Sequence, residues 1–333
     1  MVRNHFPALT KRRDEMSKKR SIRDRATLLL LSLLFASPAI AEEKPVPSQP
    51  ASSVNKKASA AKPKLLYMRL LRDAKNKPLA LQTSIIRFVY KDPEKKDSAK
   101  NVYVDLIGAV HVGEKAYYQD LNKRFKTYDA VLYELVAPEG TRIPKGGPKG
   151  VGSSPVSAIQ VGMKSMLQLE FQLDQIDYTT KNLVHADMTP EEFSESMEKR
   201  GESMLQMFFR MMGQSMALQS RKVGKGSTDL KMLVALFSKD RNRQLKLLLA
   251  EEFESTGGAM NALEGKEGST LITERNKKAL VVLRKELDKG TRKIAIFYGA
   301  GHLSDMEKRL SADFGMSRTK EEWVDAWNLR GIK

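Results

Sequence analysis

The spacing of apolar residues predicts strands and a helix in the first part of the folded chain. Short segments rich in aliphatic and aromatic residues, in places alternating with polar positions, are typical of strands. Such segments occupy residues 65–71, 81–90, 101–107 and 129–135. Residues 113–128 carry apolar side chains at the spacing of one helix face, namely Ala116, Tyr117, Leu121 and Phe125.

The later part of the chain predicts the same kind of layer. A helix over 269–287, a buried strand over 293–298 and a helix over 303–310 follow one another. Residues 156–263 have an almost wholly helical pattern, with an N-cap at Thr189 and proline at the next position. The sequence therefore predicts one α/β domain over 65–333, with a mixed sheet, flanking helices and a helical insertion at about 156–263.

Methionine is concentrated in the predicted insertion. Met197, Met204, Met211 and Met216 recur at roughly helical spacing there. A copper-binding role or an adaptable groove are two alternatives for such a stripe. Amphipathic spacing favours a third, which is a helix face packed on the core or on a partner helix.

The first 64 residues have the pattern of an export signal followed by a linker. Nine Lys or Arg residues within 1–25 precede an apolar run over 26–35 and the small residues Ala39 and Ala41. This order predicts a signal peptide over 1–41, cleaved near Ala41, and a periplasmic or secreted protein. An uncleaved signal anchor is the alternative, and Met16 is an alternative start. Residues 42–64 are rich in Pro, Ser, Ala and Lys, which predicts a disordered linker.

Composition narrows the chemistry further. The 333-residue chain has no cysteine, which excludes disulfides, thiolate metal sites and cysteine nucleophiles. Its net charge is +18, or +12 without residues 1–41. This charge would favour anionic partners such as a membrane surface, but we expect it to reflect a lysine-rich surface in contact with water. The basic residues are scattered and are not interleaved with aromatic ones, so we expect no nucleic-acid partner.

Two of the few histidines stand in the same local setting. An apolar strand runs into Gly-x-x-His at 108–111 and again at 299–302, and each motif is followed by a helix. Ligands of open α/β sheets bind beyond the carboxyl ends of the parallel strands. We therefore expect His111 and His302 to face one crevice, although either could instead cap the helix that follows it.

A carboxylate adds a third candidate. Glu134 lies at the end of the predicted strand over 129–135. A carboxylate at the end of a buried strand is costly unless it is paired, hydrogen-bonded or bound to a metal. Together with His111 and His302, it would suit a divalent cation with an open position for water, or it could be the base that activates that water.

Three further residues are candidates for substrate binding or for supporting these groups. Asn276 lies on the apolar face of the helix over 269–287, next to Arg275. This arginine could hold a substrate carbonyl or form a structural pair with a glutamate. His185 shares one side of an extended segment with Asp187, as a supporting pair or, as we expect, in a local hydrogen bond.

The motifs at 108–111 and 299–302, Glu134 at a strand end, and Arg275 and Asn276 opening a late helix resemble the TraB/GumN family, which includes Tiki-type metalloproteases. The resemblance spans roughly residues 103–310. It implies an α/β core with a helical segment between the motifs. It also implies an active site of His111, Glu134 and His302, lined by Arg275 and Asn276. Some members are divalent-metal-dependent peptidases, while related erythromycin esterases and haem-binding proteins differ in chemistry.

We therefore expect an exported metal-dependent hydrolase, a peptidase by preference, acting on a peptide or protein. His111 and His302 would bind Mn, Co or Zn, with Glu134 completing the metal shell or acting as base. One alternative is a protein that binds a ligand such as haem, or docks a partner through its methionine-rich helices. Another is metal-free ester hydrolysis with a His–Glu pair as base.

Overall fold

The computed structural model describes residues 67–91, 101–147, 166–203, 234–235, 237–263 and 268–331. The predicted signal peptide, the linker and Met204, Met211 and Met216 lie outside these residues. Within the described part of the chain, no helix is both long enough and apolar enough to cross a membrane.

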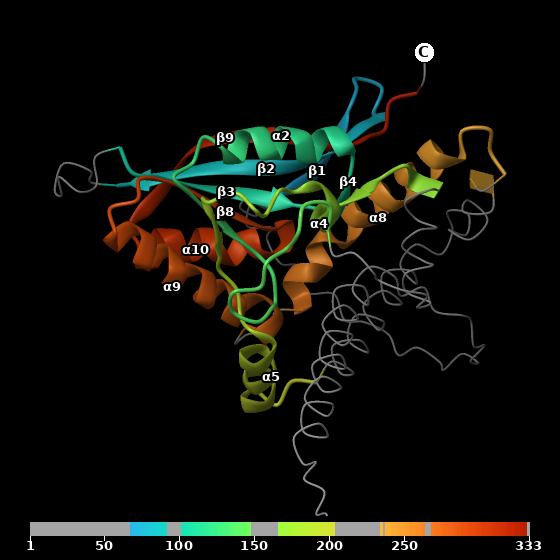
Figure 1. The fold of residues 1–333 in the computed structure, drawn as a ribbon. Coiled ribbons are helices and arrows are strands. Elements are labelled where there is room, and N and C mark those ends of the chain that lie inside the picture. Colours follow the sequence, from blue (N-terminus) through green and yellow to red (C-terminus); the bar gives the residue numbers. More distant parts are fainter. Residues whose placement is uncertain are drawn as a thin grey trace, which may run out of the picture.

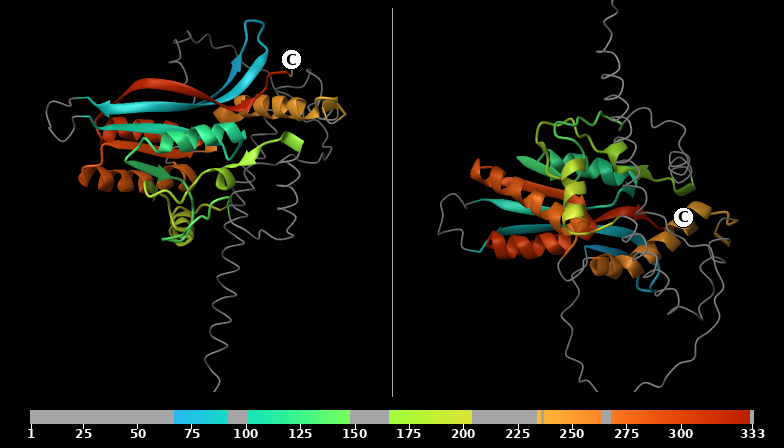
Figure 2. Two further views of the ribbon diagram at one scale, coloured as in Figure 1. Left: turned by 45° about the horizontal axis from the view of Figure 1, so that its top comes forward. Right: turned by 90° about the horizontal axis from the view of Figure 1, so that it is seen from below.

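A seven-stranded mixed sheet forms the centre of the molecule (Figure 1). Its strands are β1 (Met68–Arg72), β2 (Pro78–Tyr90), β3 (Tyr103–Ala109), β5 (Ala130–Tyr133), β7 (Leu183–His185), β8 (Lys293–Gly299) and β9 (Met316–Asn328). Along one side of β2 lies β9, and Figure 2 shows these two long strands running together. The other side of β2 pairs with β1 and then with β3, both antiparallel.

The remaining part of the sheet is parallel and positions the candidate site. Strands β3, β8, β5 and β7 lie side by side in that order and run in the same direction. Their carboxyl ends therefore meet at one edge. A separate two-stranded sheet, β4 (Val112–Gly113) with β6 (Glu170–Phe171), lies just beyond that edge because β4 directly follows β3 and His111.

Helices cover both faces of the sheet, because successive strand residues point to opposite sides. Leu106, Leu132 and Ile296 pack on one face with α9 (Arg275–Asp288) and α10 (Leu303–Asp313). Their neighbours Ile107, Val131 and Phe297 pack on the other face with α2 (Lys115–Phe125) and α8 (Arg241–Leu263). The shorter helices are α4 (Gln172–Gln175) and α5 (Pro190–Lys199). This arrangement confirms the predicted α/β fold with a mixed sheet and flanking helices.

Two features depart from the predicted pattern. The region 156–263 is not wholly helical, because β6 and β7 lie within it and β7 extends the main sheet beside β5. A strand of three residues is too short to show a period of two. Strand β9 was not predicted either, because its stretch Arg318–Glu322 is mostly charged. Among the described strands it pairs with β2, and most of its side chains are partly or fully exposed.

Candidate functional site

The candidate residues come from the carboxyl ends of the four parallel strands. His111 follows β3 by two residues, Glu134 comes directly after β5, and His185 is the last residue of β7. Strand β8 ends at Gly299, and a short 3₁₀ turn (Ala300–His302) leads from it into α10. The strand register aligns these ends, because Gly299 pairs with Ala109 of β3.

Three of the predicted site residues meet around Gly299. A Cβ atom at this glycine would lie 3.3 Å from Glu134 Oε2, 3.8 Å from His302 Cδ2 and 3.9 Å from His111 Nε2. The Gly299 N–H donates a 2.6 Å hydrogen bond to Glu134 Oε2, and His302 Nε2 lies 3.5 Å from Glu134 Oε1. The glycine thus allows a strand end to approach the carboxylate closely, and both imidazoles lie beside it.

Asn276 determines which ring nitrogen carries the hydrogen in the neutral form of His302. The Asn276 Nδ2 atom donates to the His302 carbonyl over 3.1 Å and to Asp305 Oδ2 over 2.9 Å, and both of these partners can only accept. Its Oδ1 atom therefore accepts the Nδ1–H of His302 over 2.7 Å. In the neutral imidazole this leaves the Nε2 lone pair facing Glu134. Nε2 and Glu134 Oε1 are then two acceptors that face one another over 3.5 Å.

Arg275 sets the charge of the site. Its Nη2 atom lies 2.6 Å from Glu134 Oε1 and 2.6 Å from Asp187 Oδ2, and its Nε donates to Asp187 Oδ1 over 3.0 Å. All three side chains are at most 10% exposed. The arginine is thus a buried bridge between two carboxylates, which includes the Arg–Glu pair considered from the sequence.

This bridge decides the ionisation of Glu134. Burial alone raises the pKa of this carboxyl, but the charge of Arg275, and after it His302 and His111, lower it further than burial raises it. The pKa of Glu134 therefore lies well below its ordinary value, and the group is ionised at neutral pH. Such a carboxylate is a strong charge partner and a weak proton acceptor.

The structure around β7 corrects the expected hydrogen bond between His185 and Asp187, and it adds Asp187 to the candidate site. His185 does not bond to Asp187, because its Nε2 atom lies 2.6 Å from the Leu135 carbonyl. It thereby holds the chain just after Glu134 and does not join the two other histidines. Asp187 instead pairs with Arg275 and was missing from the predicted site. The only sequence signal for it was that a buried arginine requires a carboxylate partner.

The donor types around Gly299 fit a divalent cation, because imidazole nitrogens and a carboxylate are common ligands of Mn, Co and Zn. The hydrogen bond from His302 to Asn276 is also the kind that orients a metal-binding histidine. Across the described residues, however, no three His, Asp or Glu side chains are already arranged as a metal-holding group. Small side-chain movements would be needed to bring three ligands onto one ion.

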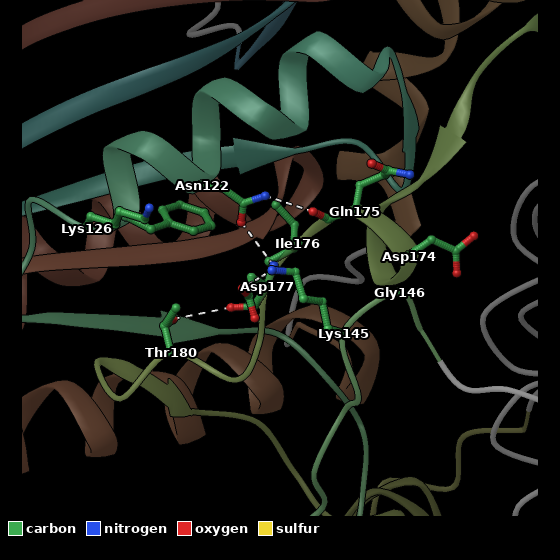
Figure 3. Close-up of a pocket in the computed structure, with 10 residues that line it drawn as sticks. Asn122, Lys126, Lys145, Gly146, Asp174, Gln175, Ile176, Asp177 and Thr180 are labelled. Carbon is green, nitrogen blue, oxygen red and sulfur yellow. Dashed lines mark hydrogen bonds and ion pairs between the residues drawn. The ribbon is translucent and has the colours of Figure 1, made fainter.

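A cavity of about 390 Å³ has other lining residues (Figure 3). Its lining residues include Phe125 at the end of α2, Lys126 just after it, Lys145 and Gly146 of the loop after β5, and Asp177. Asn122 bridges two of its walls by bonding to the Gln175 carbonyl and the Asp177 N–H. None of the predicted site residues lines this cavity.

No profile of a known protein family, no curated protein and no solved structure matches the chain. The TraB/GumN resemblance therefore stays a prediction from short motifs. The functional conclusion depends on the site around Gly299 and on the charges that surround it.

Proposed function

We propose that this protein is an exported metal-dependent hydrolase, of the peptidase class, with its active site at Gly299. The observation that carries the proposal is the convergence of His111, Glu134 and His302 at the carboxyl edge of the parallel strands. These side chains come from three separate strand ends. Catalytic groups are commonly found at this edge of α/β sheets, where loops leave room for a substrate.

In this proposal His111 and His302 hold a divalent cation, Mn, Co or Zn. When bound, such a cation lowers the pKa of a coordinated water and polarises the scissile carbonyl. Asn276 keeps Nε2 of His302 free as the ligating atom, because its Oδ1 accepts the hydrogen bond from the Nδ1–H. Arg275 and Asp187 hold Glu134 in place and balance its charge.

The low pKa of Glu134 favours one of the two roles predicted for it, which are metal ligand and general base. An efficient general base at neutral pH has a pKa close to the working pH. Glu134 is far below that range, which favours a role as ligand or orienting carboxylate over that of base. The proton released by the attacking water would then pass to solvent.

The test combines metal binding with hydrolysis. Calorimetry with Mn, Co and Zn is expected to show binding by the wild type and its loss in His302→Ala and His111→Ala. A pool of internally quenched peptides is expected to be cleaved by the wild type, not after chelation, and not by Glu134→Gln. Glu286→Gln is a matched control, because Glu286 is a buried glutamate of α9 bonded to Lys289 and Thr291. Absence of metal binding together with unchanged hydrolysis in His111→Ala would refute the proposal.

A metal-free hydrolase is the second candidate. It is favoured by the 3.5 Å approach of His302 Nε2 to Glu134 Oε1, which suits a His–Glu pair, while the described residues form no ready-made metal group. It predicts hydrolysis that persists in the presence of a chelator. Export is tested separately, by mass spectrometry of the N-terminus of the protein isolated from its source, where cleavage near Ala41 is expected.

A further inference from the structure

The segment just before α8 exposes two large apolar side chains to water. The Phe237 side chain is 88% exposed and that of Val234, three residues earlier, is 65% exposed. A single exposed apolar side chain is ordinary in a folded protein and needs no explanation. Whether these two have a role therefore depends on where the segment lies and on which groups accompany them.

The start of α8 projects from one end of the molecule. In Figure 1 and in both views of Figure 2, the lighter orange end of this helix and the turn before it lie beyond the ends of the sheet strands. The following part of α8 is fixed to the core, because Leu245 and Ala250 are buried there and Lys246 Nζ lies 2.6 Å from Glu114 Oε1. The helix therefore holds the preceding turn away from the sheet, where other molecules can reach it.

Two cations accompany the exposed aromatic ring. Lys239 and Arg241 follow Phe237 by two and four residues, and both are exposed. No carboxylate of the described residues forms an ion pair with either of them. The acidic residue between them, Asp240, lies 3.5 Å from Arg243 Nη1 instead. The projecting turn thus combines exposed apolar side chains with two positive charges that the described part of the protein does not neutralise.

This combination fits an anionic lipid surface better than a protein surface. An ordinary protein interface takes about 800 Å² from each partner, whereas a phenylalanine side chain supplies about 150–250 Å². A lipid surface needs no partner of complementary shape. Apolar side chains can enter its acyl region while neighbouring Lys and Arg side chains stay with the negatively charged headgroups.

We propose that the turn before α8 is a membrane-contact site for anionic phospholipid. Val234 and Phe237 insert into the apolar part of the lipid surface, and Lys239 and Arg241 bind the headgroups. The inference is independent of the hydrolase proposal, because none of these four side chains belongs to the site around Gly299.

The test uses a fluorescent label that reports on this turn alone, because the chain has no cysteine of its own. Val234→Cys in the full chain carries a nitrobenzoxadiazole label, whose emission shifts to the blue in an apolar phase. Val281→Cys is the matched control, since Val281 of α9 is another exposed valine, 52% exposed. With vesicles of phosphatidylcholine and phosphatidylglycerol we expect a blue shift at position 234 and none at 281. With phosphatidylcholine alone, the shift at 234 should be much smaller.

Further variants of the labelled protein separate the apolar and charged contributions. Phe237→Ala should raise the concentration of mixed lipid needed for the blue shift about tenfold or more, because the burial of an aromatic side chain is lost. Lys239→Gln and Arg241→Gln should each raise it about fivefold. Lys115→Gln, which removes an exposed lysine of α2, should change it little. All of these side chains are exposed, so the variants are expected to fold.

Equal emission at positions 234 and 281 in the presence of mixed vesicles would overturn the inference. So would an unchanged blue shift, in size and in the lipid concentration required, when Phe237→Ala is combined with Lys239→Gln and Arg241→Gln. A blue shift that grows with protein concentration without vesicles would also overturn it, because the turn would then contact a second copy of the chain. None of these measurements depends on catalysis, so failure of the hydrolase proposal would leave them unaffected.

Discussion

Replacing Arg275 with methionine should reveal how strongly the buried bridge holds the site together. The substitution keeps a similar length and removes the charge between Glu134 and Asp187. Both carboxylates would then be buried without a cation, since their side chains are 10% and 0% exposed. Removing one partner from a buried ion pair costs about 3–5 kcal/mol, a large part of the roughly 5–15 kcal/mol that stabilises a typical domain.

The free energy of unfolding that Arg275→Met loses should become smaller as the pH falls. In the wild type the pKa of Glu134 is lowered, so its stabilising contribution is complete above the unfolded pKa of about 4.3 and constant between pH 7 and 5. In Arg275→Met, burial no longer opposed by the arginine raises the folded pKa above the unfolded one. The variant therefore gains stability as the pH falls through that raised pKa toward the unfolded one, and its free energy of unfolding comes closer to that of the wild type.

Urea unfolding of Arg275→Met and wild type, followed by the fluorescence of Trp323 and Trp327, measures the difference in their free energies of unfolding at pH 7.5 and pH 5. Arg124→Met is the matched control, because Arg124 also bridges two carboxylates, Asp120 and Glu322, with all three partners at least 31% exposed. Exposed pairs contribute about 0–1 kcal/mol, so the control should lose no more than that. Equal losses in the two variants, or a loss for Arg275→Met that does not shrink at pH 5, would refute the reasoning.

Three further predictions concern the same edge of the sheet and its supports. Gly299→Ala places a methyl group 3.3 Å from Glu134 Oε2 and should reduce hydrolysis of the peptide pool about tenfold, with a smaller effect on urea unfolding; unchanged turnover would contradict the close approach. Asn276→Leu removes the acceptor of the His302 Nδ1–H and should weaken metal binding about 10- to 100-fold by calorimetry; an unchanged affinity would exclude His302 as an oriented ligand. Thr189→Ala removes the capping box of α5 and should cost about 1 kcal/mol in urea unfolding, while leaving metal binding unchanged.

Local sequence features were sufficient for much of the fold. The strand over 293–298 and the helices on either side of it were predicted from apolar spacing, and β8, α9 and α10 lie there. The N-cap at Thr189 was also predicted and is present as a capping box. These features depend on neighbours within a few residues, so the sequence around each one contains the information that determines it.

The position of the candidate site was predicted from two features alone, the repeated Gly-x-x-His motif and the carboxylate at a strand end. His111, Glu134 and His302 lie around one glycine, because parallel strands bring their carboxyl ends to one edge. Asp187 was missed as the partner of Arg275. Ion pairs and packing between residues this far apart in the chain leave no periodic pattern.

The sequence by itself determined the alternation of strands and helices, the two Gly-x-x-His turns and the residue types available for chemistry. Only the tertiary structure decided that β7 and β9 join the sheet, that Asp187 completes the bridge to Arg275, and that Glu134 stays ionised while buried. The physical reason is that strand order, burial and charge pairing depend on which distant segments pack together. The free energy of that packing depends on all of these segments together, so no single segment of the sequence determines it.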